Sequence, residues 1–169
     1  MKLNRLITIF LLTVFLTACN SSDDCLEETD VRLTIDFMTR TYDNNSKTYK
    51  NAAFVIDSLT VRGLESDSLI HNNSKRLKSI QLPLRIGIDE TAFEIRFNDI
   101  TDTLYFHHNN NDQYFISLEC GCVVAHEILR ISTTAHFSDS IIINNKDVNN
   151  IETTHIQIFN QFVFFVGNL

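Results

Sequence analysis

Val31-Arg32-Leu33-Thr34-Ile35-Asp36-Phe37-Met38 is the stretch that decides the fold class. Its odd-numbered positions are apolar, and most positions between them are polar or charged. Side chains of an extended chain point alternately to the two faces of a sheet, so the pattern predicts a β-strand with one buried face. No stretch beyond residue 18 keeps a 3.6-residue apolar period, and helices are therefore expected to be few.

Short apolar segments of the same kind recur along the chain, separated by turns rich in Asn, Asp and Ser. We expect further strands over residues 54–61, 80–84, 92–97, 103–107, 114–120, 122–129, 131–137, 140–143 and 155–166. Eight to ten short strands at regular spacing indicate an all-β protein. The prediction is an immunoglobulin-like antiparallel β-sandwich, and a lipocalin-like barrel is the alternative because alternation fits both.

Three polar runs are expected to be surface loops, namely Asp43 to Ser46, His71 to Ser74 and Asn109 to Asp112. Binding residues often lie on loops that a rigid scaffold positions. These runs are therefore candidate contact sites.

The first 18 residues have the features of a signal peptide. Lys2 and Arg5 form a basic start, and residues 6–16 form an apolar run too short to span a bilayer. The run leads into Leu16-Thr17-Ala18-Cys19, which resembles the lipobox of bacterial lipoproteins. The resemblance implies that residues 1–18 are removed and that Cys19 is lipidated, so that two or three acyl chains hold the protein on a membrane.

A polar, acidic run follows, Asn20-Ser21-Ser22-Asp23-Asp24. It resembles the short export signal behind the lipidated Cys of surface lipoproteins in Bacteroidetes-type bacteria, which implies a position on the outer face of the outer membrane. A solvated tether is the other interpretation. The expected division is a signal peptide over 1–18, a lipidated Cys with an acidic tether over 19–30, and a single β-sandwich domain over 31–169.

Charge and composition limit the partners. Hydrophobic residues make up 44% of the chain, so a folded core is expected, and the formal net charge is −7. Removing the signal peptide would also remove Lys2 and Arg5 and make the charge more negative. An acidic protein is repelled by phosphate backbones, and nucleic acid is therefore not expected as a partner.

Three cysteines remain after Cys19 is set aside as acylated: Cys25, Cys120 and Cys122. The number is odd, so one thiol is left over in an oxidising compartment. We predict a disulfide from Cys25 to Cys120 or Cys122, closing a loop of roughly 95 residues. A tight Cys120–Cys122 ring is the alternative. A structural metal site usually needs four ligands, and no further ligand stands at a fitting distance in the sequence.

Strand alternation also suggests where these thiols lie. Tyr114, Ile116 and Leu118 share one face with Cys120 and Cys122 if the strand continues. Should that face be the core, both thiols are expected to be buried.

No catalytic pattern is present. His126-Glu127 lacks the second His that a zincin helix carries four residues further on, and the acidic pairs do not follow a calcium-loop spacing. The chain has no Gly-x-Ser-x-Gly motif and no Gly-rich phosphate loop. The sequence therefore predicts no metal, no cofactor and no enzymatic activity.

The run Tyr114-Phe115-Ile116-Ser117, followed by Cys120-Gly121-Cys122, stands in one chain with the lipobox, Cys25 and the segment 80–84. This combination resembles a family of uncharacterised small Bacteroidetes lipoproteins, a domain of unknown function. The resemblance implies location and fold, and it transfers one functional residue, the lipidated Cys19.

Two function classes follow. The first is a non-catalytic interaction or structural module, anchored by lipid at the outer membrane, with a protein or glycan partner. The second is a barrel-type carrier of a small apolar ligand. A filled core favours the first class, and an apolar cavity of several hundred cubic ångströms, on the order of ordinary ligand pockets, favours the second.

Overall fold

The structure is a computed structural model that describes residues 25, 27, 29–44, 46–65 and 68–166, except for the side chains of residues 111, 112 and 161–166. The predicted signal peptide, Cys19 and the acidic run behind it lie outside the described residues. The described chain forms eleven strands: β1 (Arg32–Asp43), β2 (Thr48–Ala53), β3 (Leu59–Gly63), β4 (Leu69–Ser74), β5 (Ser79–Pro83), β6 (Glu90–Phe97), β7 (Ile100–Ser117), β8 (Gly121–Thr133), β9 (Ser138–Ile143), β10 (Asp147–Val148) and β11 (Ile156–Val166). Within these residues, no helix has the length and apolarity needed to cross a membrane.

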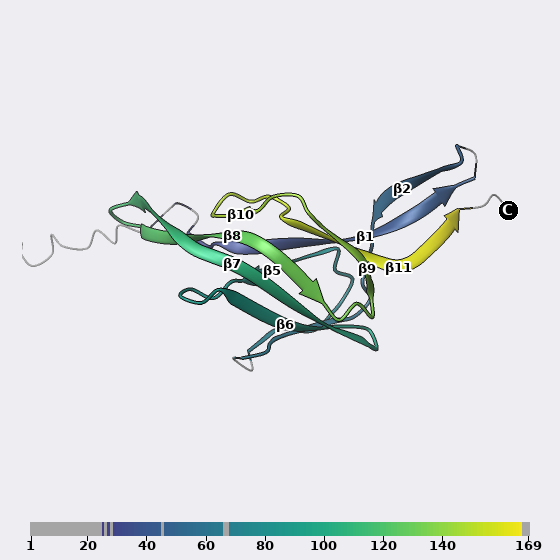
Figure 1. Ribbon diagram of the computed structural model, residues 1–169, viewed down its shortest axis with the longest axis horizontal. Coiled ribbons are helices and arrows are strands. Elements are labelled where there is room, and N and C mark those ends of the chain that lie inside the picture. The colour runs from purple at the N-terminus through teal and green to yellow at the C-terminus, as the bar shows by residue number, and fades with distance from the viewer. Residues whose placement is uncertain (1–24, 26, 28, 45, 66–67, 167–169) are drawn as a thin grey trace, which may run out of the picture.

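The strands form two sheets (Figure 1). The first has the order β2-β1-β11-β9, with β5 beside β1, and the second has the order β10-β8-β7-β6-β3-β4. Neighbouring strands are antiparallel except for β1 and β11, which run parallel. The prediction of an all-β antiparallel sandwich is confirmed, with one parallel pair that the sequence did not indicate.

Alternation in β1 points Leu33, Ile35 and Phe37 into the core, where each is fully buried. The second sheet supplies aromatic partners: Phe97 lies edge-on to Phe37, with ring centroids 5.5 Å apart, and stacks on Phe137 at 3.9 Å. Full burial of one such side chain stabilises a fold by roughly 1.5–3 kcal/mol. Aliphatic and aromatic side chains from both sheets thus fill the core.

Several predicted strand limits are wrong. The run 109–112 is not a turn but part of β7, and residues 71–74 belong to β4. Segments 122–129 and 131–137 mostly form one strand, β8, whereas β3 begins only at Leu59. The cause is tertiary pairing: β8 and β3 supply the backbone hydrogen bonds that Asn-rich segments would otherwise make in turns, and the irregularity remains as a register shift between Asn109 and Asp112.

The molecule has two distinct ends (Figure 1). The β7–β8 turn lies at the left, near the start of β1, and we call this region the tether end. The strand β2 and the last parts of β1 and β11 lie at the right, where β11 pairs with β1 as far as Val166.

Candidate functional site at the tether end

A disulfide joins the first described residue to the β7–β8 turn. Cys25 is bonded to Cys120, which lies 95 residues further along the chain, with the two Cα atoms 4.8 Å apart. Of the two partners that the sequence left open for Cys25, the structure brings Cys120 to it. The bond fixes the start of the folded domain to the turn.

The turn is compact and exposes large apolar side chains. Ser117 Oγ accepts a hydrogen bond from the backbone N–H of Cys120 at 3.1 Å, and Gly121 has a φ of 72°, which favours glycine. Leu118 is 89% exposed and Phe115 is 59% exposed.

The condition for burying both thiols is not met, because the face with Tyr114, Ile116 and Leu118 is only half-buried at the first two residues and exposed at Leu118. Cys122 is exposed and without a disulfide partner, and Leu118 faces solvent. The reason is that β7 continues beside β8 beyond His107, where its pairing with β6 ends, so the turn reaches past the neighbouring strands. Nothing in the local sequence marks the point at which a strand leaves the core.

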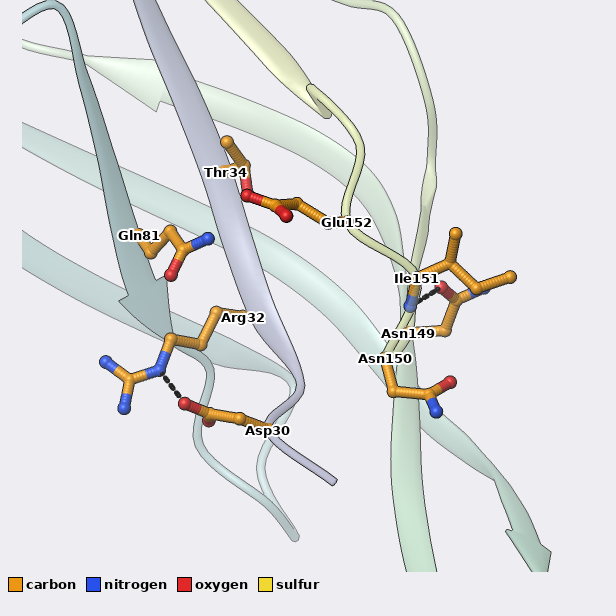
Figure 2. A pocket seen from close by; sticks show the side chains of 8 residues that line it. All are labelled: Asp30, Arg32, Thr34, Gln81, Asn149, Asn150, Ile151 and Glu152. Carbon is orange, nitrogen blue, oxygen red and sulfur yellow. Dashed lines mark hydrogen bonds and ion pairs between the residues drawn. The ribbon is translucent and has the colours of Figure 1, made fainter. Parts of the chain in front are cut away.

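An open polar pocket lies on the outer face of β1 and β5 (Figure 2). Its volume is about 260 Å³, and its lining consists of Asp30, Arg32, Thr34, Gln81, Asn149, Asn150, Ile151 and Glu152. Arg32 and Thr34 point outward because Leu33 and Ile35, between and beside them, point into the core. The pocket thus follows directly from the alternation of β1.

Hydrogen bonds shape the wall formed by residues 149–152. Asn149 Oδ1 accepts a bond from the N–H of Ile151 at 2.9 Å, and Asp30 pairs with Arg32 at the rim (Figure 2). The backbone N–H of Asn150 donates to Tyr114 Oη at 3.2 Å, which joins this wall to the β7–β8 hairpin. The pocket offers amide, hydroxyl and charged groups of both signs.

A buried polar network crosses the second sheet near the tether end. Thr91 Oγ1 lies 2.8 Å from His108 Nε2, and Asn110 Oδ1 lies 2.9 Å from His108 Nδ1 and 2.6 Å from His126 Nδ1. Because the amide oxygen only accepts, both imidazoles donate from Nδ1, and the Thr91 hydroxyl donates to His108 Nε2. This arrangement is that of two neutral rings, each with its proton on Nδ1, in one chain of hydrogen bonds.

Burial explains the acidity of these imidazoles. Burial, together with a smaller contribution from the neighbouring His108, lowers the pKa of His126 to about 4. Burial also lowers the pKa of His108, against a smaller opposing effect of its bond to Asn110. The pair is uncharged near neutral pH, and its bonds hold β6, β7 and β8 together.

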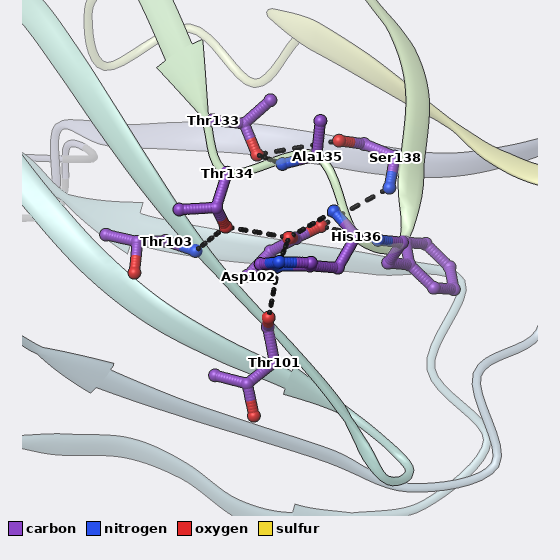
Figure 3. A network of polar contacts seen from close by, with 9 residues as sticks. Thr101, Asp102, Thr103, Thr133, Thr134, Ala135, His136 and Ser138 are labelled. Carbon is purple, nitrogen blue, oxygen red and sulfur yellow. Dashed lines mark hydrogen bonds and ion pairs between the residues drawn. The ribbon is translucent and has the colours of Figure 1, made fainter.

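Asp102 forms a second network, at the β8–β9 connection (Figure 3). Its carboxylate is 1% exposed and accepts bonds from the backbone N–H groups of His136 at 2.7 Å and Phe137 at 2.8 Å, and from Thr134 Oγ1 at 2.8 Å. Burial alone would raise the pKa of Asp102, but these bonds outweigh burial and hold the pKa below its usual range. The carboxylate thus anchors a loop, and its oxygens are directed at the backbone.

The sequence did not point to either network, nor to the pocket. The pocket joins three segments far apart in the chain, and Asn110 had been assigned to a turn. Within the described part of the chain, no three His, Cys, Asp or Glu residues gather as a metal site. Cys122 stands apart from the disulfide-bonded pair, and Cys19 lies outside the described residues.

Comparison with known proteins gives one match. Neither a curated protein nor a solved structure matches the chain. Residues 58–160 match a family of unknown function, DUF6452, and this range covers more than half of the sequence, from just before β3 into β11. The chain belongs to this family of unknown function.

Proposed function

We propose that the protein is a lipid-anchored outer-membrane lipoprotein of the Bacteroidetes type, and that its β-sandwich is a non-catalytic interaction module. The observation that carries the proposal is the Cys25–Cys120 disulfide. Five residues lie between it and the lipobox Cys19, so the Cα atoms of the two cysteines are about 20 Å apart when the segment is extended. A cross-link so close to an acylated residue holds the sandwich in a defined position against the membrane.

The two buried groups with shifted pKa values, Asp102 and His126, support a non-catalytic role. The carboxylate of Asp102 accepts hydrogen bonds from backbone N–H groups, and His126 donates a hydrogen bond from Nδ1 to Asn110 Oδ1. Both are buried and neither lines the polar pocket. A catalytic acid or base must reach the substrate proton, which these groups do not.

The filled core favours an interaction module over a carrier. Phe37, Phe97 and Phe137 occupy the space between the sheets that a barrel would leave for a ligand. The described apolar pocket, lined in part by Leu64, Ile70 and Leu84, measures about 120 Å³. Ligand pockets are commonly about 300–1,000 Å³.

The polar pocket is where we expect the partner to bind, and its groups suit a protein segment. Gln81, Asn149 and Asn150 carry amides that match the donors and acceptors of a peptide backbone. Asp30 and Arg32 offer opposite charges at the rim. A glycan would meet the same amides, and the binding test below separates the two.

Lipidation tests the anchoring. Cells fed an alkyne fatty acid should produce tagged protein, because Cys19 receives the acyl chains. Cys19→Ala should abolish the tag and leave the precursor uncleaved, whereas Cys122→Ser should keep both tag and cleavage. A processed, soluble Cys19→Ala protein at normal yield would contradict the proposal.

Binding is tested by native pull-down from solubilised membranes. Gln81→Arg places a bulky cation in the pocket and should remove the partner, while the matched change Asn51→Arg, on exposed β2, should retain it. A retained species that glycosidase digests and protease does not would identify a glycan. Identical recovery with all three proteins would exclude the pocket as the binding site.

A further inference from the structure

The β7–β8 turn concentrates exposed apolar surface at the point where the tether joins the sandwich. Leu118 is 89% exposed and Phe115 is 59% exposed. Two residues after Leu118, Cys120 is bonded to Cys25. Large apolar side chains gathered at one place mark an interaction surface, unlike those scattered singly.

The strand register shows that this turn stands clear of the sandwich. The strand β6 accompanies β7 only as far as His107, which pairs with Glu90. Beyond that residue β7 continues beside β8 to Ser117. Figure 1 shows the hairpin reaching past the neighbouring strands at the left, so the sheets leave its tip uncovered.

The length of the tether limits how far this tip can lie from the membrane. Five residues lie between Cys19 and Cys25, so the two cysteines are about 20 Å apart at most. A lipid on Cys19 therefore keeps the turn within about that distance of the membrane. The turn lies at the end of the molecule nearest the attachment point.

The charge of the residues around the turn indicates which lipid head groups it can meet. The chain has no Lys or Arg between Arg96 and Arg130, and Glu27 and Glu119, on either side of the disulfide, are exposed. Anionic head groups attract basic segments and repel acidic ones. The tip is therefore suited to a zwitterionic phospholipid surface, into which apolar side chains partition without electrostatic attraction.

We propose that Leu118 and Phe115 insert into the zwitterionic membrane interface that holds the lipidated Cys19, giving the domain a second point of membrane contact and a fixed orientation. This inference rests on the proposed lipid anchoring. The acyl chains supply the affinity, and the turn sets the angle of the sandwich to the membrane.

The test uses the absence of Trp from the sequence. Leu118→Trp introduces a single indole at the exposed tip, and Leu129→Trp introduces one at a half-exposed position further along β8. Each lipidated full-length protein is reconstituted into phosphatidylcholine vesicles with brominated acyl chains. The Leu118→Trp indole should shift its emission to the blue and lose most of it to bromine quenching, and the Leu129→Trp indole should remain quenchable by aqueous acrylamide.

Two further measurements separate the outcomes. Adding Phe115→Ser to the Leu118→Trp protein should weaken bromine quenching. Bromine quenching of the Leu118→Trp protein should also be weaker in vesicles that contain anionic lipid. If the protein floats with the vesicles but the Leu118→Trp indole stays open to acrylamide, membrane insertion is excluded and lipid anchoring stands. If the protein fails to float with the vesicles, anchoring fails and the inference falls with it.

Discussion

The three cysteines beyond the lipobox have different surroundings. Cys25 and Cys120 are bonded to each other, while Cys122 is exposed and lies two residues from the bond. Gly121, between the last two, takes a left-handed conformation with a φ of 72°. A straight strand would place the thiols of Cys120 and Cys122 on one face. With this bend between them, Cys120 is bonded to Cys25 and Cys122 remains a free, exposed thiol.

A thiol count in denaturant without reductant should therefore find one free cysteine among these three. Cys122→Ser should lower the count to zero, and Cys25→Ser should raise it to two because Cys120 loses its partner. Ring closure between Cys120 and Cys122 predicts the opposite for Cys25→Ser, a count of zero. Three free thiols in the wild type would rule out both pairings.

His126 should make the protein less stable as the pH falls. Its pKa in the folded protein is about 4, against an ordinary value of 6.5. Between these values the unfolded chain binds a proton that the folded chain does not, so the free energy of unfolding decreases by up to about 3 kcal/mol. Asp102 acts in a lower window, because its stabilisation is lost only as the pH falls through its own lowered pKa.

Urea unfolding at about pH 7 and about pH 4.5 measures this dependence. His126→Asn removes the titrating ring and should flatten the dependence even if it lowers stability at both values. His136→Asn, at a side chain that is 65% exposed, serves as the control. It should retain most of the decrease in the free energy of unfolding between the two pH values. An unchanged slope in His126→Asn would show that other groups cause the loss.

Single-residue burial was predictable only where it follows alternation. Leu33, Ile35 and Phe37 are buried as their spacing indicates. His126 and Asn110 carry no such signal, because a polar side chain is buried only when partners from other strands satisfy it. Those partners become neighbours through pairing of β7 with β8, which the sequence does not encode locally.

At the scale of elements, β1 is the strand on which the first sheet depends. It pairs with β5 and β2 along one edge and with β11 along the other. The matched family range, residues 58–160, begins after β1 and β2. It contains the whole second sheet but not the strand that supplies Leu33, Ile35 and Phe37 to the core.

The fragment 58–160 should therefore fail to fold alone. Its β5 would have no partner strand, and β11 would keep only β9. We expect no cooperative thermal transition by circular dichroism, whereas residues 25–169 should melt cooperatively. A fragment with a sharp transition would mean that the second sheet and its turns suffice for a stable core.

Strand existence was easier to predict than strand extent. The hairpin of β6 and β7 follows from two alternating segments around Asn98-Asp99, and the structure pairs them from Glu90 to Phe97. The Asn run at 109–112 looked like a turn because Asn favours turns. Its pairing with β8 overrides that preference.

At the scale of the whole molecule, the two-layer arrangement follows from many short alternating segments. The parallel pairing of β1 with β11 does not, since it joins positions such as Thr34 and His155, 121 residues apart. The polar pocket depends on the same long-range closure, because residues 149–152 reach Arg32 and Thr34 only when β11 lies beside β1.

The proposed position at the outer membrane is tested on the whole molecule. If the acidic run acts as an export signal, protease added to intact cells should digest the protein. Replacing Asp23 and Asp24 with Ala should protect it, and replacing Ser21 and Ser22 with Ala serves as the charge-neutral control. Equal protection of the wild type and the Asp variant would place the protein inside the outer membrane.

The Cys25–Cys120 bond also determines how the protein responds to force. If Cys19 carries a lipid, tension on that lipid would enter the fold at the β7–β8 turn, because the disulfide bypasses residues 26–31 and β1. The pull would then act along β7 and β8. It would load their hydrogen bonds to β6 and β10 in shear, so that these bonds resist as a group rather than opening one after another. With the bond reduced, the same pull would act at Arg32, the start of β1, which lies between β5 and β11 in the first sheet.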